Sequence, residues 1–373
     1  MSQPLAGIVV VELGHSVAAP ALGQILGDLG AEVVKVEKAG GDDARKWGPP
    51  FLDGQAATFQ SINRNKRSVV CDLRDPLQRG RLVEYIVRQA DVVLQNLRPG
   101  QVDELGLGAA ALIALKPSLV YCNVGAFGAK GPLSGRPGYD PLMQAFGGIM
   151  SVVGEEGRPP VRVGPSIIDQ GTAMWGAIGI LAALYRRKES GKGGVVDVSL
   201  FETAAAWMVM YAAQYHGSGE LPQRHGSGAP GIVPYRAYRT KDGDLVVAAA
   251  NDGLFKSLCG VLGFTWFEDP RFKTNPERVR NAKELYPMIE KEMVKRGNAE
   301  WTALLDAAGV PCAPVQNVKQ MLEHPQMQAL GLLQAVPGSS KPLIGLPISF
   351  DHERPLPRSA SPALGGHTKE VLG

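Results

Sequence analysis

The 373-residue chain has few cysteines, no spacing typical of a metal site and almost no net charge. None of its four cysteines, at positions 71, 122, 259 and 312, forms a C-x-x-C pair, which argues against a zinc site or a disulfide framework and fits a reducing compartment. The six histidines show no H-x-x-x-H spacing, so no metal is predicted. With 39 basic and 36 acidic residues, a net charge of +3 gives no argument for nucleic-acid binding.

The chain also lacks targeting and membrane signals. Its first ten residues, MSQPLAGIVV, carry no basic segment and continue into a predicted strand, so they do not resemble a signal peptide. The longest apolar stretch, residues 171–185, is shorter than the ~20 residues that span a bilayer. We therefore expect a cytoplasmic protein with no membrane partner.

Dinucleotide and nucleophile motifs are missing as well. The first loop that joins a strand to a helix, LGHSVAAP at residues 13–20, has no G-x-G-x-x-G, although Glu37 stands where a ribose-binding acid would. The sequence has neither a P-loop nor a G-x-S-x-G elbow. No tightly bound cofactor is expected.

Alternating strand and helix patterns predict an α/β fold. A hydrophobic content of 45% and a charged content of 20% are globular values, and ~150 residues per domain suggests two domains. Strands are predicted at 8–13, 32–37, 68–72, 91–95, 119–124 and 195–199, with helices at about 20–29, 76–88, 109–115, 141–150, 170–188 and 200–215. Continuous Val/Ile/Leu strands alternating with helices indicate a parallel sheet covered on both faces.

A smaller second domain is expected after a change in composition. Residues 217–231 are rich in glycine and polar residues and are predicted to form a linker with a Gly-containing loop. A hairpin around Asp242-Gly243 and three helices then make 232–329 a small α+β domain. The Pro-rich tail, 330–373, is expected to pack back on the large domain of residues 1–216.

Asp169 is the candidate catalytic residue, and its position allows two interpretations. It precedes a long Ala/Gly/Ile-rich helix, where aspartate is favoured as an N-cap. A carboxylate can also act as a nucleophile and form covalent acyl intermediates. The two roles are compatible, because a helix N-terminus stabilises an anion.

Several motifs together resemble the class III CoA-transferases, the formyl-CoA transferase and carnitine CoA-transferase family. They are VVELGHSVAAP (10–20), GDLGAEVVKVE (27–37), NKRS (65–68), NLRPG (96–100), GRPGYD (135–140), Asp169 with GILAAL (179–184), and GGVVDVS (193–199). Each is weak alone, but their order and spacing match over residues 5–330. The resemblance implies a Rossmann-like large domain built from both chain ends, a small domain and an interlocked homodimer.

The resemblance also implies a reaction. The carboxylate at the Asp169 position attacks an acyl-CoA thioester, and the resulting anhydride is converted to an aspartyl-CoA thioester that the acceptor acid attacks. CoA and a small carboxylic acid are then substrates, with succinate, mesaconate, citramalate and glutarate as candidate acids. An acyl-CoA racemase is the main alternative, but its Gly-His-Asp motif is Gly138-Tyr139-Asp140 here, and tyrosine is a poor base. A non-catalytic CoA-binding protein is a second alternative.

The positions expected to bind CoA follow strands or precede the active site. By resemblance they are His15, Ser16, Val17 and Ala18; Lys38; Leu73 and Arg74; Asn96, Leu97 and Arg98; and Arg136, Tyr139 and Asp140. For each of the lysine and arginine positions, the alternative interpretation is a solvated surface charge with no role in binding. Glu104 replaces an arginine that contacts CoA in formyl-CoA transferase, and Arg98 is the candidate to compensate. Asp140 is expected either to orient the acyl group or to cap the helix that follows.

The segment Gly226-Ser227-Gly228 stands where relatives have a glycine-rich lid. Its serine departs from an all-glycine run, and a plain turn between domains is the alternative interpretation.

Overall fold

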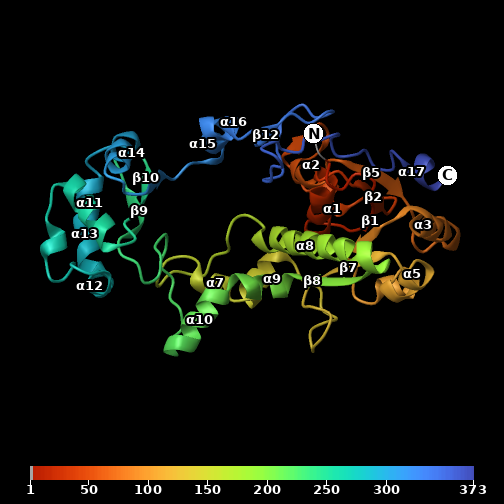
Figure 1. Ribbon diagram of the computed structural model, residues 1–373, viewed down its shortest axis with the longest axis horizontal. Coiled ribbons are helices and arrows are strands. Elements are labelled where there is room, and N and C mark those ends of the chain that lie inside the picture. The colour runs from red at the N-terminus through yellow and green to blue at the C-terminus, as the bar shows by residue number, and fades with distance from the viewer. Residues whose placement is uncertain (1–2) are drawn as a thin grey trace. The chain divides into compact units, whose positions relative to one another are not determined.

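The computed structural model describes residues 3–373, which divide into two compact units (Figure 1). The first unit runs to Ile149 and also contains Arg162–Gly219 and Pro325–Gly373, so it holds both ends of the chain. The second unit consists of Met150–Val161 and Glu220–His324. The sequence predicts that residues 150–161 belong to the large domain, because no change in composition marks them as part of the second unit.

A six-stranded parallel sheet forms the centre of the first unit. Its order is β5 (Lys66–Val70), β2 (Glu32–Glu37), β1 (Val9–Leu13), β6 (Val92–Gln95), β7 (Val120–Gly125) and β8 (Gly194–Ser199). The predicted α/β class and parallel sheet are confirmed, and every predicted strand starts within two residues of its observed position. The third predicted strand begins earlier, at Lys66, because Lys66 pairs with Val33 of β2 and its charged side chain is buried in the sheet edge.

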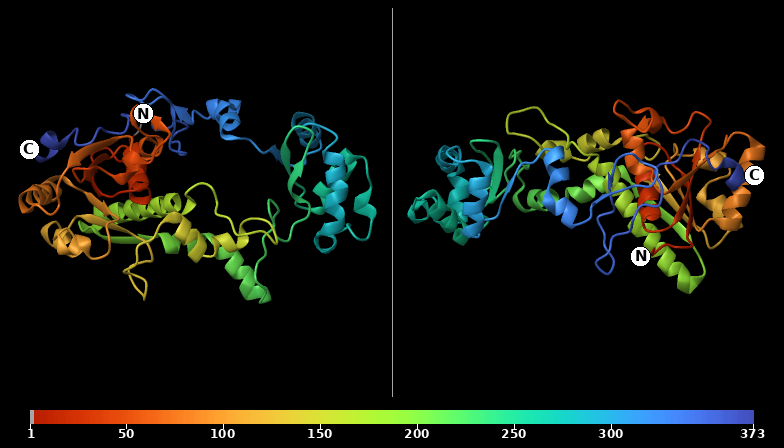
Figure 2. Two further views of the ribbon diagram at one scale, coloured as in Figure 1. Left: turned by 180° about the vertical axis from the view of Figure 1, so that it is seen from behind. Right: turned by 90° about the horizontal axis from the view of Figure 1, so that it is seen from above.

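Helices cover both faces of this sheet. Apolar side chains of β1, β2, β6 and β7, such as Val11, Val34 and Val93, pack against α3 (Pro76–Gln89), α5 (Ala109–Leu115) and the C-terminal α17 (Thr368–Leu372). The opposite face meets α1 (Ala18–Asp28) and α8 (Ile167–Ser190), which pack on each other. Figures 1 and 2 show α3 and α5 away from the α1 and α8 pair.

Arg358 makes one of the contacts that hold the C-terminal tail on the first unit. The Arg358 guanidinium donates hydrogen bonds to the carbonyls of Gly27, Gly30 and Ala31 at 2.8–3.0 Å. Those carbonyls lie at and just beyond the end of α1, where helix carbonyls have no partner within the helix. The tail therefore completes the end of an N-terminal helix.

Two predicted helices are interrupted in the structure. The one expected at 141–150 ends early as α6 (Asp140–Phe146) at Gly147 and resumes as the short α7 (Ile149–Val152). The one expected at 200–215 is divided at Met208 into α9 (Leu200–Trp207) and α10 (Val209–Ser218). Helix α8 is long and apolar enough to cross a membrane by length and composition alone. Half of its most apolar stretch is buried inside the protein, as in a core helix.

The second unit is built on a three-stranded antiparallel sheet. Its order is β11 (Cys312–Pro314), β10 (Asp244–Ala248) and β9 (Tyr235–Arg239), so the predicted hairpin is present. The helices are α11 (Asp252–Leu262), α12 (Asn275–Arg280), α13 (Ala282–Met293), α14 (Asn298–Ala307) and α15 (Val318–Glu323). Of these, α11, α13 and α14 form one apolar core with the sheet, around Phe255, Ile289 and Trp301.

Candidate active site

Asp169 lies in the first turn of α8 but does not cap it. The N-cap position is Ser166, whose side chain makes no capping bond. The cap is supplied by Asp140, whose Oδ2 accepts hydrogen bonds from the backbone N–H groups of Ile168 (2.8 Å) and Asp169 (3.1 Å). The N-cap interpretation of Asp169 is therefore wrong, because a carboxylate from another helix occupies that role.

The Asp140 carboxylate is held on both oxygens. Its side chain is buried, at 2% exposure, and Oδ1 accepts a hydrogen bond from Gln144 Nε2 at 2.6 Å. Gln144 in turn accepts the N–H of Val163 at 2.8 Å, which fixes the segment leading into α8. Asp140 does not cap its own helix α6, as one interpretation expected, since that helix has no side-chain cap. It caps α8 instead.

The Asp169 carboxylate is left without a partner. Across residues 3–373 its oxygens make no hydrogen bond or ion pair, although the side chain is half-buried. Burial, and secondarily the negative charge of Asp140, raises the pKa of Asp169 from an ordinary 3.8 to about 7. A half-buried carboxyl group with a raised pKa and no hydrogen bond that stabilises the fold is a candidate for a catalytic role rather than a structural one.

The predicted CoA-binding positions at strand ends come together on one edge of the sheet. Residues 15–18 follow β1, Lys38 follows β2, Leu73 and Arg74 follow β5, and residues 96–98 follow β6. These four strands are neighbours in the order β5-β2-β1-β6, so their carboxyl ends lie side by side. Open α/β sheets bind ligands at this edge.

Within this edge, Asn96 holds the backbone of His15. Its Oδ1 accepts the His15 N–H at 2.9 Å, and its Nδ2 donates to the His15 carbonyl at 2.8 Å. The Asn96 amide is thus engaged by the neighbouring loop. Ser16 has a left-handed φ of 67° and shares a 3.0 Å contact with the His15 ring. Val17 and Ala18 follow as the start of α1.

His15 is expected to be neutral near pH 7. Loss of solvent around the ring lowers the pKa of His15 below its ordinary 6.5, although the nearby Asp42 carboxylate opposes this effect. A neutral imidazole can accept as well as donate a hydrogen bond.

The cations at this edge are exposed. Lys38 forms a 2.8 Å ion pair with Asp43 in which both side chains are largely in solvent. The guanidinium groups of Arg74 and Arg98 are exposed and, within residues 3–373, make no hydrogen bond or ion pair. Two unpaired guanidiniums on the same edge of the sheet, at the ends of β5 and β6, suit a phosphate-bearing ligand.

Other predicted positions lie elsewhere. Arg136 and Tyr139 lie on the segment between β7 and α6; Arg136 stacks 5.6 Å over the Phe127 ring, and Tyr139 is 61% exposed. Gly226, Ser227 and Gly228 belong to the second unit. There Gly226 N–H bonds to the Gly154 carbonyl and Ser227 Oγ accepts the Ala237 N–H, so the segment is held as a turn.

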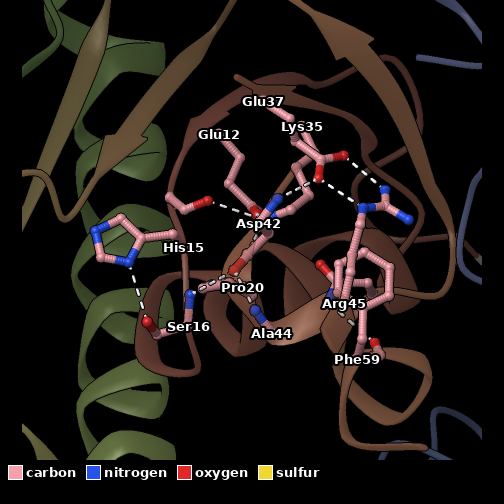
Figure 3. A network of polar contacts seen from close by, with 12 residues as sticks. Glu12, His15, Ser16, Pro20, Lys35, Glu37, Asp42, Ala44, Arg45 and Phe59 are labelled. Carbon is pink, nitrogen blue, oxygen red and sulfur yellow. Dashed lines mark hydrogen bonds and ion pairs between the residues drawn. The ribbon is translucent and has the colours of Figure 1, made fainter. Parts of the chain in front are cut away.

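Sequence reasoning missed a buried charged cluster beneath the strand ends. Glu12, Lys35 and Ser68 are aligned across β1, β2 and β5 on the face that α1 covers, and Asp42 and Lys66 join them. Figure 3 shows Glu12, Lys35 and Asp42 of this cluster. The signal was present, because Glu12 and Lys35 each stand inside a run of strand valines. Glu37 is buried nearby and bonded to Arg45 and Ser68, so its carboxylate is already engaged.

Comparison with known proteins places the chain in a family. The pattern of CoA-transferase family III matches residues 5–368. The chain is 38% identical to succinate–glutarate CoA-transferase of Agrobacterium fabrum, covering 99% of this chain and 95% of that one. It is 34% identical to succinyl-CoA:glutarate CoA-transferase of Mus musculus, covering 99% and 86%.

The chain belongs to CoA-transferase family III. A solved structure of a CAIB/BAIF family protein from Brucella suis agrees with the fold, at a TM-score of 0.91, 37% identity and full coverage of both chains. This family III CoA-transferase uses CoA thioesters as substrates. The resemblance drawn from the motifs is confirmed.

Proposed function

We propose that this CoA-transferase moves CoA between succinyl-CoA and a small dicarboxylic acid such as glutarate, with Asp169 as the nucleophile. The observation that carries the proposal is the unpartnered Asp169 carboxylate at the start of α8, next to a buried carboxylate that already performs the capping. The named substrates of the Agrobacterium and mouse relatives support the choice of acids.

The reaction then proceeds through two anhydrides and one enzyme thioester. An Asp169 oxygen attacks the thioester carbonyl, the C–S bond breaks, and CoA leaves as a thiolate. The thiolate attacks the aspartyl carbonyl of the anhydride and releases the first acid as its carboxylate. The acceptor carboxylate attacks the aspartyl-CoA thioester and again expels the thiolate. Attack of that thiolate on the new acyl group yields the product and restores the Asp169 carboxylate.

CoA docks in this proposal at the edge formed by β5, β2, β1 and β6. The exposed Arg74 and Arg98 and the weakly paired Lys38 would meet its phosphates, because a surface ion pair contributes only ~0–1 kcal/mol and is readily exchanged. The fixed His15–Val17 loop would contact the part of CoA beyond its phosphates. No metal or tightly bound cofactor enters the reaction.

Racemisation is the less favoured activity. The racemase base is a histidine in a Gly-His-Asp motif, and the corresponding residue here is Tyr139, an exposed phenol, which is a poor general base. Asp169 alone would have to remove and return the proton from opposite sides of one carbon.

We also propose a homodimer. Helix α8 exposes a stripe of large apolar side chains on one face: Met174, Trp175, Ile178, Leu181 and Tyr185. A contiguous apolar stripe on the longest helix of a unit is typical of an interface.

A grid of acyl-CoA donors and free acids, read by mass spectrometry, tests the proposed activity. Succinyl-CoA with glutarate should give glutaryl-CoA and succinate, and acetate or butyrate should be poor acceptors. Mesaconate and citramalate extend the dicarboxylate series. Absence of exchange with every dicarboxylate, or rapid α-proton exchange without transfer, would refute it.

A further inference from the structure

The loop that follows β1 is fixed at three consecutive residues by side chains from elsewhere in the fold. Gly14 offers its carbonyl to Lys35 Nζ at 2.8 Å, His15 is bonded through both backbone groups to Asn96, and Ser16 donates its N–H to Asp42 Oδ1 at 3.1 Å. Lys35 and Asp42 are also bonded to each other at 2.9 Å. One buried ion pair therefore holds the loop on either side of His15 (Figure 3).

The loop needs this support because its backbone is strained. Ser16 has a φ of 67°, in the left-handed region that residues other than glycine, asparagine and aspartate rarely adopt. Such a conformation is unfavourable by itself and persists only where surrounding bonds determine it. In Figure 3 the His15 ring points away from the buried cluster, so the strained turn presents His15 outward.

The Lys35 ammonium is surrounded by three protein oxygen atoms. It donates hydrogen bonds to Glu12 Oε1 at 2.9 Å and to the Gly14 carbonyl at 2.8 Å, forms an ion pair with Asp42 Oδ2 at 2.9 Å, and its side chain is wholly buried. Asp42 is equally engaged, since its Oδ1 accepts both the Ser16 and the Ala44 N–H groups. Neither residue can contact a ligand directly.

Stability alone does not explain this ion pair. Taking two charges out of water costs several kcal/mol per ion, and well-packed apolar residues of similar volume usually serve at least as well. What apolar residues cannot do is accept the Ser16 N–H and donate to the Gly14 carbonyl. The ion pair therefore fixes the backbone of residues 14–16, which a hydrophobic pair would not do.

We propose that Lys35 and Asp42 are positioning residues that preorganise residues 14–16 for CoA. The inference rests on the proposed docking of CoA at this edge of the sheet. Because the loop is already in its binding conformation, CoA does not have to order it, and the ordering cost is removed from the measured affinity. Loss of the ion pair should weaken CoA binding without removing any group that touches CoA.

Lys66 provides a matched control. It is also a buried lysine bonded to Glu12, through Oε2 at 2.8 Å, but its other acceptors are Asn63 and the Pro20 carbonyl and not the loop. Lys35→Met and Lys66→Met each remove one buried ammonium from the same carboxylate. Only the first removes a bond to residues 14–16.

The experiment measures CoA affinity by calorimetry and amide hydrogen exchange of residues 14–17 in the full-length protein. We expect Lys35→Met to raise the Kd for CoA at least about tenfold and to speed exchange in the loop. Lys66→Met should lower the melting temperature comparably and leave the Kd within about twofold. Asp42→Asn, which keeps an acceptor oxygen but loses the ion pair, should give a smaller rise in Kd and is the variant to use if Lys35→Met fails to fold.

The outcomes separate this inference from the proposed function. Equal changes in Kd for the two lysine variants, or unchanged loop exchange in Lys35→Met and Asp42→Asn, would overturn the positioning role while CoA binding by the wild type stands. Failure of the wild type to bind CoA would refute the proposed docking instead, and the exchange measurement would still decide whether the ion pair fixes the loop.

Discussion

Asp140 caps the helix that carries Asp169. One buried carboxylate, 2% exposed, accepts the N–H groups of Ile168 and Asp169, so the second carboxylate is not needed for the helix start. The same Asp140 charge contributes to the raised pKa of Asp169. Asp140 therefore caps α8, and the Asp169 side chain is not used for that cap.

The first prediction concerns the proposed nucleophile. Asp169→Asn should lower kcat at least about a thousandfold, because an amide oxygen cannot open a thioester and form the anhydride. The fold should remain intact, since the Asp169 side chain makes no hydrogen bond within residues 3–373. Steady-state kinetics and circular dichroism measure the two effects, and trapped wild-type enzyme should show a CoA adduct on the peptide containing Asp169. A fully active Asp169→Asn enzyme would contradict the assignment.

The second prediction separates the two roles of Asp140. Asp140→Asn keeps an oxygen that can cap α8 but removes the charge that raises the pKa of Asp169. From the Asp169 pKa of about 7, the acidic limb of the wild-type kcat profile is expected near pH 7, and in Asp140→Asn it should move to lower pH. Asp140→Ala should also destabilise the protein by about 1 kcal/mol through the lost cap. An unchanged pH profile in Asp140→Asn would argue against charge coupling.

A third prediction follows from the sign of the Asp169 shift. Its pKa is about 7 in the folded protein and ordinarily 3.8, so between these values the folded state holds more protons than the unfolded state. The Asp169 contribution to stability therefore falls as pH rises from about 4 to 7. The melting temperature of Asp169→Asn minus that of the wild type should increase over this range and level off above it. A difference that is constant with pH would show that the carboxyl group is not perturbed.

The fourth prediction concerns CoA docking. Arg98→Ala and Lys38→Ala should raise the Kd for CoA more than they lower kcat, because both side chains follow strands at the edge proposed to dock CoA and neither is assigned a part in bond making. Arg88→Ala is the control, since Arg88 is an exposed arginine of α3 that forms an ion pair with Glu84. The loss in affinity should shrink as salt is added, which screens charge–phosphate attraction. Calorimetry with unchanged CoA affinity in both variants would refute the docking site.

The strands could be predicted from sequence because their signal is local: valine runs define them. The prediction of Asp169 as a nucleophile came from the family resemblance, since its place before an apolar helical pattern is equally typical of an N-cap. The cap from Asp140 could not be predicted, since its partners lie 28 and 29 residues away and depend on how α6 meets α8. The buried Lys35–Asp42 pair was hidden for the same reason: a lysine within a strand is recognisable as unusual, but its partner comes from a later loop.

The fifth prediction tests the homodimer through the exposed stripe of α8. Ile178 is 55% exposed at the centre of the stripe, so Ile178→Glu should leave the folded unit intact and place a charge in the proposed interface. Leu77→Glu is the matched control, because Leu77 is 67% exposed on α3, on the other face of the sheet. Light scattering at micromolar concentration should give a dimer for the wild type and for Leu77→Glu, and a smaller or aggregated species for Ile178→Glu. A dimer of unchanged mass and stability in Ile178→Glu would remove this face from the interface, and an active wild-type monomer would contradict the homodimer itself.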